Sequence, residues 1–412
     1  MSRLIQMELY KFMKQRKNQI ILAGLFLFFL GVVIYYSYEQ RQYDFNMRSE
    51  MESEYYNASA VVDSLSLKKD RLEKGTKEEV EEIKRTSPDF YEEYDFWMNE
   101  KDTSFKLFYY YKNRKVKGAE YCKKIEVEKY KNLLIGWEKG FMSKDQLISR
   151  GQEPTELERQ IRINQYLLKN KLHIVDNPYQ LTGVNFLFLM LKGYMPMILL
   201  VIIILLCMDI FLSEMEEGSY KLYLTQPFSR RKAFLSKIFV AGITSIGSVV
   251  VLLFAFFGIT SILNGVGSMK YPQTMTEGKM LLSLTPDSNL LGKLDITTTG
   301  KYLMLGYLLL ALVIITTVMV TIYISVLTDS TSITIGVITA LLLLGFVLSS
   351  FLDTTISLHA FYPLTYINVY SVLNAQVNAP LLLGLVVNGL IVFVALILSY
   401  QRFCKKDLLG GC

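Results

Sequence analysis

Histidine and cysteine are scarce in this chain of 412 residues, with two copies of the first and four of the second. The two histidines, His173 and His359, lie in no motif of a zinc site or of a serine hydrolase. The four cysteines show no metal-ligand spacing, and only Cys122 lies in the long polar segment, so no disulfide framework is expected there. These shortages argue against a metal-dependent or hydrolytic enzyme.

A nucleotide-binding signature is also missing. A P-loop needs Gly-x-x-x-x-Gly-Lys followed by Ser or Thr, whereas the Gly-Lys pairs that begin at 278, 292 and 300 are followed by Met, Leu and Tyr. Carboxylates are nearly absent from the long apolar runs, which weakens a mechanism driven by an ion gradient. The chain is therefore expected to have no ATPase activity, and any work that it performs must be supplied from outside.

Hydrophobic residues, by contrast, make up 51% of the chain and are concentrated in long runs. A helix of about 20 apolar residues crosses the hydrocarbon core of a bilayer, which is about 30 Å thick. The sequence therefore predicts an all-α polytopic membrane protein with six transmembrane helices. The first span is expected at 19–37, and the other five lie within 186–412, with apolar runs at 186–212, 238–263, 302–327, 332–351 and 381–400.

Basic residues flank these runs and indicate the orientation. Residues 1–18 place Ile5, Leu9 and Phe12 on one helical face among several lysines and arginines, which is typical of an amphipathic helix on the membrane surface. The last run is followed by Arg402, Lys405 and Lys406. By the positive-inside bias, both termini are predicted to be cytoplasmic. No small-residue cleavage site follows the first run, so we expect a retained signal anchor in the cell membrane.

The long polar segment at 38–185 separates the first span from the second, so it is predicted to be an external, mostly helical domain. Residues such as Met51, Ala58 and Val62 follow alternating steps of four and three, which predicts a helical seam rising from the membrane. Thr76 and Glu79 form a capping-box pattern, whereas 105–111 fits either a strand or a helix. The domain is interpreted as a helical cap without a ligand, and the alternative is a receptor or gate for a transported molecule.

Two further polar segments are expected outside. Residues 264–300 contain Pro272 and Pro286, and residues 352–379 are too polar to cross the membrane but aromatic enough to dip into its outer interface. Residues 328–331 are the only link between the fourth and fifth spans, so a tight cytoplasmic hairpin is expected there.

The segment at 213–237, SEMEEGSYKLYLTQPFSRRKAFLSK, is a charged insert between two apolar runs. Its basic residues predict a cytoplasmic position. Pro227 is expected to end a short helix, and Ser229 can cap a second helix that continues through Arg230 into the next span. Considered as charge alone, such a loop is usually a contact with anionic lipid headgroups.

The order of features in this insert is more specific than its charge. An acidic cluster, a glycine, a short apolar helix, Pro-x-Ser-Arg and a closing lysine, placed after the second of six spans, resemble the coupling loop of ATP-binding-cassette permeases of the type 2 exporter class. The matching residues are Glu214, Glu216, Glu217, Gly218, Pro227, Ser229, Arg230 and Lys237.

The resemblance implies that this loop docks on a separate ATPase subunit, which binds ATP and Mg. It also implies a second permease copy or homologue that completes the path, and a role for 1–18 as a connecting helix beside the ATPase. The resemblance covers the membrane portion, whereas the external domain is not explained by it.

Hydroxyl-bearing residues within the spans suggest a path for an amphipathic substrate. Thr316, Thr317 and Thr321 are candidates for lining it, although hydrogen bonds between helices are the favoured interpretation of such hydroxyls. Lys192 is the most deeply placed base and a candidate for the same path, although a position near the outer end would let it reach the interface.

The function expected from these features is export of an amphipathic or hydrophobic substrate, such as an antimicrobial peptide, a drug or a lipid-like molecule. Its partners would be the ATPase, a second permease and membrane lipids. The basic excess lies beside the spans, so a nucleic-acid partner is not expected. The alternative is a non-transporting membrane sensor whose external domain binds a ligand and signals inward. A membrane-embedded enzyme is disfavoured by the missing catalytic groups.

Overall fold

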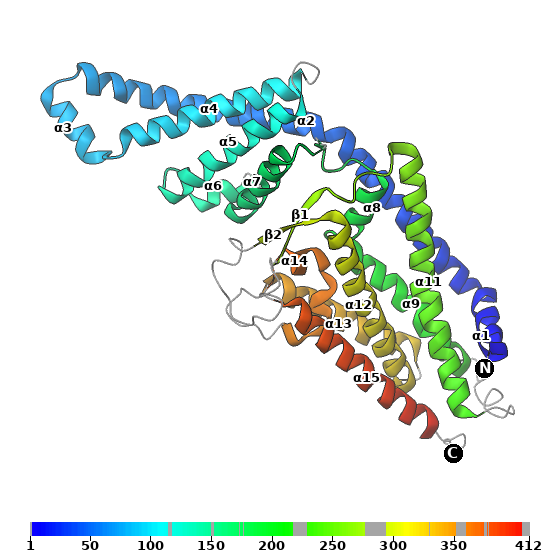
Figure 1. Ribbon diagram of the computed structural model, residues 1–412. Coiled ribbons are helices and arrows are strands. Elements are labelled where there is room, and N and C mark those ends of the chain that lie inside the picture. The colour runs from blue at the N-terminus through cyan, green and yellow to red at the C-terminus, as the bar shows by residue number, and fades with distance from the viewer. Residues whose placement is uncertain are drawn as a thin grey trace. The chain divides into compact units, whose positions relative to one another are not determined.

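A computed structural model describes most of the chain, and Figure 1 shows its helices. The described residues are 2–113, 118–149, 152–172, 174–175, 177–216, 229–276, 294–328, 330–351, 360–374, 377 and 379–405. The chain divides into two compact units. The membrane unit comprises Met1–Ile34, Leu181–Lys270 and Met275–Cys412, and the polar unit comprises Tyr35–Gln180 and Tyr271–Thr274.

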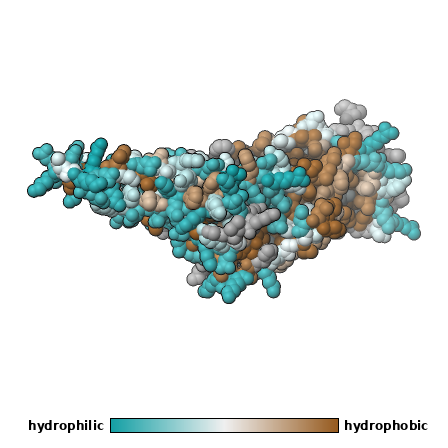
Figure 2. Space-filling view, turned by 90° about the horizontal axis from the view of Figure 1, so that it is seen from above, coloured by the Kyte–Doolittle hydropathy of each residue, from teal (hydrophilic) through white to brown (hydrophobic). Residues whose placement is uncertain are grey.

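Helices dominate both units. Figure 2 shows hydrophobic side chains gathered over the membrane unit and mostly hydrophilic side chains over the polar unit. The membrane unit contains α1 (Ser2–Lys14), the start of α2 (Arg16–Lys74), α8 (Gly183–Met190), α9 (Met195–Glu216), α11 (Arg230–Asn264), α12 (Thr299–Thr328), α13 (Thr331–Phe351), the 3-10 helix η4 (Pro363–Ile367), α14 (Val369–Leu373) and α15 (Leu381–Lys405).

Five of these helices are long and apolar enough to cross a membrane, namely α2, α9, α11, α12 and α15. The sixth predicted span corresponds to α13, whose apolar part among the described residues, Thr331–Gly345, is shorter than a full crossing. The chain is thus an all-α polytopic membrane protein, and the sixth span remains a prediction. The short link expected between the fourth and fifth runs is present, because α12 ends at Thr328 and α13 begins at Thr331, and its cytoplasmic position remains a prediction.

The second predicted span is interrupted. α8 ends at Met190, Gly193 adopts a φ of 62°, and α9 begins at Met195. A left-handed φ is accessible to glycine at little cost and stops a helix, so this glycine separates two apolar helices. The boundary of the membrane unit at Leu181 places α8 with the other apolar helices.

The segment at 352–379 was expected to dip into the outer interface, and its described part packs among α12, α13 and α15. Tyr366 is fully buried, and its hydroxyl donates a hydrogen bond to the Ala360 carbonyl at 2.9 Å. A Cβ built on Gly384 of α15 would lie 2.3 Å from the Tyr366 ring. The ring therefore occupies the space that a larger residue at 384 would need.

The polar unit contains the rest of α2, followed by α3 (Lys77–Thr86), α4 (Phe90–Lys112), α5 (Ala119–Glu138), α6 (Lys144–Ser149) and α7 (Pro154–Lys169). The predicted seam is confirmed, since Met51, Ala58 and Val62 of α2 are buried in cores shared with α4 and α5. The capping box of Thr76 and Glu79 at the start of α3 is also confirmed. Residues 105–111, left open by the sequence, are helical within α4.

A buried ionic cluster joins three helices of the polar unit. The Lys129 ammonium on α5 lies 2.8 Å from a Glu54 carboxylate oxygen on α2 and 2.5 Å from one of Glu100 on α4, and it donates a hydrogen bond to the Ser104 hydroxyl. All four side chains are at most 5% exposed. Burial alone would lower the pKa of Lys129, but the Glu100 and Glu54 carboxylates outweigh it and raise that pKa above its usual value.

A small sheet departs from the all-α expectation. Strands β1 (Pro272–Thr276) and β2 (Leu294–Thr298) pair within the predicted external segment 264–300. Proline at the first position of β1 removes one backbone donor, which is tolerated at the start of a strand. Among the described residues this sheet has two strands, so the fold remains helical in character.

Candidate functional site

The candidate site lies where the charged loop 213–237 joins the membrane unit. Figure 1 shows the start of α1 and the end of α15 at this end of the unit, together with the end of α9 and the start of α11. We call it the terminal end of the membrane unit and define it by α1, the last turns of α9, the first turns of α11 and the last turns of α15.

Lys237 is the buried centre of the terminal end. It lies on α11 and is 1% exposed. Its ammonium donates a hydrogen bond to the Ile210 carbonyl of α9 at 2.9 Å and lies 3.5 Å from a carboxylate oxygen of Glu8 on α1. The same ammonium lies 5.6 Å from the centre of the Phe211 ring, which is a cation–π distance. One side chain therefore connects three helices.

Glu8 is the partner that makes this burial possible. It is the only acidic residue of α1, it is 5% exposed, and it also lies 3.7 Å from Lys11. A buried ammonium is costly unless an opposite charge and hydrogen-bond acceptors surround it. Removal of either member of such a pair leaves an uncompensated charge and typically costs about 3–5 kcal/mol. The pair thus holds α1 against the start of α11.

The turn from α1 into α2 is fixed by a second buried polar residue. Asn18 is fully buried, and its side-chain amide donates to the Phe12 carbonyl at 3.1 Å and to the Gln15 side chain at 2.8 Å. Phe12 is 4% exposed. The predicted amphipathic helix at 1–18 therefore exists as α1 and is joined to the first span by an ordered turn.

Arg230 connects the other side of the loop to the end of the chain. Its guanidinium donates a hydrogen bond to the Cys404 carbonyl at 2.8 Å, in the last turn of α15. The last carbonyls of a helix have no partner within that helix, so a cationic donor stabilises them. Ser229 caps α11 as predicted by accepting a hydrogen bond from the Lys232 amide at 3.4 Å.

Aromatic rings pack beneath these polar contacts. The Phe234 ring of α11 lies 6.1 Å from that of Phe211 on α9 and 5.4 Å from that of Phe403 on α15, between ring centres. Phe211, Phe234 and Phe403 are all at most 2% exposed. The ends of three predicted spans thus form one rigid base from which the loop 213–237 departs.

The predicted coupling residues divide into two sets. Ser229, Arg230 and Lys237 are described, and the structure brings the last two into the terminal end. Glu214 and Glu216 lie on the final turn of α9, but their side chains are outside the described part, as are Glu217, Gly218 and Pro227 entirely. Sequence reasoning missed Glu8, although a lone acid beside the apolar stripe of a basic helix was an available signal.

Lys192 lies at the break between α8 and α9. Its ammonium is 5.4 Å from the centre of the Tyr370 ring on α14, and the residue is partly exposed. Asn374, the residue that follows α14, donates a hydrogen bond to the Tyr302 hydroxyl of α12 at 2.9 Å. The cation–π contact places Lys192 beside one aromatic ring of the segment after α13.

The candidate path residues Thr316, Thr317 and Thr321 are at most 3% exposed. Their hydroxyls donate to carbonyls four residues earlier, those of Leu312, Val313 and Thr317. The interhelical hydrogen bonds favoured from the sequence are therefore wrong for these three hydroxyls. A hydroxyl inside a helix readily satisfies itself on the preceding turn of the same helix.

No group of three or more potential metal-ligating side chains occurs within the described parts of the chain. The three cysteines that the structure describes, Cys122, Cys207 and Cys404, are free thiols. Burial raises the pKa of the Cys122 thiol, which keeps it protonated.

Comparison with known proteins identifies the family. Residues 3–408 match the model of the ABC-2 family transporter protein. The match spans nearly the whole chain, so the chain belongs to the ABC-2 transporter family and is a membrane-embedded permease of that type. Such a permease is a transport subunit that associates with an ABC ATPase. No curated protein and no solved structure matches.

Proposed function

We propose that this chain is the permease subunit of an exporter that moves an amphipathic or hydrophobic molecule across the cell membrane. An antimicrobial peptide, a hydrophobic drug and a lipid-like molecule are the substrate classes that fit its apolar spans. A separate ATPase binds ATP and Mg and supplies the work, since the sequence has no P-loop. A second permease, identical or homologous, completes the path.

The observation that carries this proposal is the buried contact of Lys237 with Glu8 and Ile210. A loop can transmit force to the spans only where its ends are fixed to them. Here the start of α11 is bound to α1 and α9 through Lys237 and to α15 through Arg230. A displacement of the loop by the ATPase therefore moves four helices together.

The coupling residues then have distinct roles. Glu214, Glu216, Glu217, Gly218 and Pro227 belong to the part of the loop that meets the ATPase. Ser229, Arg230 and Lys237 hold its base. Lys237 acts by positioning α1, α9 and α11, because a side chain that is 1% exposed has no surface to offer a partner. In this arrangement the terminal end is cytoplasmic, in keeping with its basic residues.

Transport requires inward-open and outward-open states that nucleotide binding can interchange. States separated by a few kcal/mol are enough, provided that the ATPase binds the permease differently in each. Thr316, Thr317 and Thr321 would meet substrate only if α12 changed its packing in one of these states. Lys192 and its aromatic surroundings offer an exit site for a molecule with an apolar body and an anionic group.

The decisive experiment is purification of the tagged full-length chain followed by assays of bound ATPase and of ATP hydrolysis in proteoliposomes. An ATPase with a P-loop is expected to copurify. Glu217→Lys should abolish its retention, because the loop loses part of its contact surface. Arg230→Glu should retain the ATPase but reduce substrate-stimulated hydrolysis at least tenfold, because the base of the loop is released from Cys404.

Lys301→Glu is the matched control, since Lys301 is an exposed base at the opposite end of α12 from the loop. It should leave both readouts within twofold of the unaltered chain. A stable chain that retains no ATPase, and whose external domain binds a ligand, would contradict the exporter and favour the membrane sensor.

A further inference from the structure

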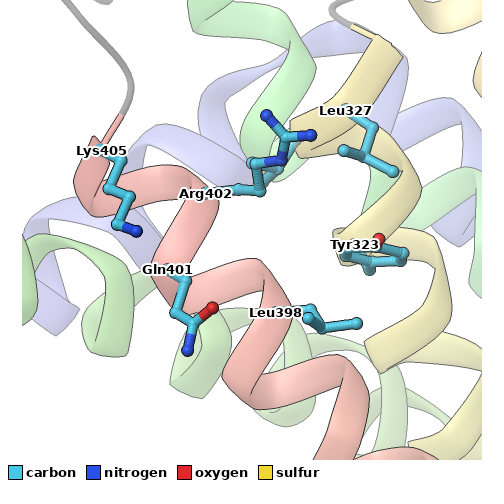
Figure 3. Close-up of a pocket in the computed structure, with 7 residues that line it drawn as sticks. Tyr323, Leu327, Leu398, Gln401, Arg402 and Lys405 are labelled. Atoms are coloured by element: carbon cyan, nitrogen blue, oxygen red, sulfur yellow. The ribbon is translucent and has the colours of Figure 1, made fainter.

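A pocket of about 530 Å³ opens between the last turns of α12 and the last two turns of α15. Figure 3 labels Tyr323 and Leu327 on α12, and it shows Leu398 and Arg402 of α15 extending toward the side of α12. Gln401 and Lys405 of α15 also line the pocket. Val326 completes the lining. The pocket lies within the membrane unit and takes no part in the contacts of Lys237 or Arg230.

Its polar side is cationic. Arg402 and Lys405 are both exposed, and within the described ranges neither forms an ion pair with a carboxylate. Gln401 and the Tyr323 hydroxyl add uncharged hydrogen-bond donors. Bases in the last turn of a helix are also favoured by the helix dipole. The dipole does not explain why two bases, an amide and a phenol line one hollow, and an arginine fork is suited to phosphate oxygens.

Its apolar side continues as a stripe along α15. Leu390, Val394 and Leu398 follow at intervals of four, so they lie on one face of the helix. They are 60%, 43% and 38% exposed. Eight residues of helix span about 12 Å, which matches the upper part of an acyl chain. The stripe ends in the cationic pocket, as an amphipathic ligand with one anionic end would require.

We propose that this pocket binds the phosphate headgroup of an anionic membrane lipid, with an acyl chain lying along Leu398, Val394 and Leu390. A soluble phosphate compound would contact the two bases, Arg402 and Lys405, but would have no apolar chain to contact the stripe. The pocket is a binding site for lipid as a resident ligand, independent of the substrate that the chain exports. The inference therefore stands whether or not the exporter function is correct.

The test uses the full-length chain in detergent, with dioleoyl phosphatidylglycerol and dioleoyl phosphatidylcholine as probes and native mass spectrometry as the readout. The unaltered chain should retain phosphatidylglycerol in preference to phosphatidylcholine. The double variant Arg402→Gln with Lys405→Gln should bind phosphatidylglycerol about 25-fold more weakly, since each base near an anionic surface contributes roughly fivefold. Its binding of phosphatidylcholine should not change.

Arg231→Gln with Lys232→Gln is the matched control, because it removes two exposed bases from α11 outside the pocket. It should change phosphatidylglycerol binding by less than threefold. Val394→Asn should weaken phosphatidylglycerol binding several-fold without removing a charge. All variants are surface substitutions, and an unchanged elution volume on gel filtration shows that they fold.

Three results would overturn the proposal. The first is an equal loss of phosphatidylglycerol from the pocket and control variants, which would show adsorption to charge in general. The second is displacement of the lipid by millimolar inorganic phosphate, which would identify a soluble anion as the ligand. The third is unchanged lipid binding with loss of a copurifying ATPase or second permease, which would make the pocket a protein interface.

Discussion

At the scale of single residues, a buried lysine joins helices in each unit, Lys237 in the membrane unit and Lys129 in the polar unit. Each is at most 1% exposed, and each is neutralised by carboxylates from other helices. Such clusters contribute less to net stability than their short distances suggest, because desolvation opposes attraction. They instead favour one packing of the helices over others, since the loss of one member leaves a buried charge without its partner. They are therefore the most sensitive positions for substitution.

Lys237→Met is expected to destabilise the membrane unit by about 3–5 kcal/mol, because the Glu8 carboxylate loses its buried partner and keeps only the more exposed Lys11 at 3.7 Å. The double variant Glu8→Gln with Lys237→Met should recover at least half of this loss, since no charge then remains to be buried. Reaction of the buried Cys207 thiol with a fluorogenic maleimide during heating measures the unfolding, in a background where the other three cysteines, Cys122, Cys404 and Cys412, are replaced by serine. A double variant as unstable as Lys237→Met would contradict the ion-pair explanation.

Lys129→Met should likewise destabilise the polar unit by about 3–5 kcal/mol, because Glu54 and Glu100 lose their common cation. The raised pKa of Lys129 also sets a pH dependence. Its contribution is complete below the unfolded value near 10.4 and is lost as the pH rises through the folded value. The unaltered chain should therefore lose stability above about pH 10.5, and the variant should lack this step. A step of equal size in both proteins would exclude Lys129 as its source.

At the scale of elements, the association of η4 with α15 depends on one small residue. Because a Cβ at position 384 would lie 2.3 Å from the Tyr366 ring, Gly384→Ala forces the ring or the helix to move. Overpacking of this kind costs about 1–3 kcal/mol. Gly389→Ala on the same helix is the control, because no heavy atom lies within 4 Å of a Cβ there. Thermal unfolding followed through Cys207 should separate the two variants, and equal stability would contradict the contact.

At the scale of the whole molecule, the two units should unfold as distinguishable transitions. The two tryptophans, Trp97 and Trp137, both lie in the polar unit, so intrinsic fluorescence reports that unit alone, whereas Cys207 reports the membrane unit. Lys129→Met should lower the transition seen by tryptophan, and Lys237→Met the one seen at Cys207. If either substitution shifts both transitions by the same amount, the units unfold as one.

Much of this architecture follows from the sequence alone. Apolar runs determine where helices can cross a bilayer, because an unsatisfied backbone in lipid is too costly, and the capping pattern of Thr76 and Glu79 is local. The charged loop at 213–237 also indicated the family, since the resemblance depends only on the order of residue types along the loop. These are short-range properties, and each can be evaluated without knowing what lies opposite.

The partners of buried side chains were decided only by the tertiary structure. Glu8 and Lys237 are separated by more than half of the chain, and no local pattern states that they meet. The pocket between α12 and α15 likewise exists only because two helices distant in sequence end side by side. The hydroxyls of Thr316, Thr317 and Thr321 show the opposite case, because each donates to a carbonyl of its own helix and not to a neighbouring helix. Periodicity fixes which face of a helix is apolar, but packing decides which other helix that face meets.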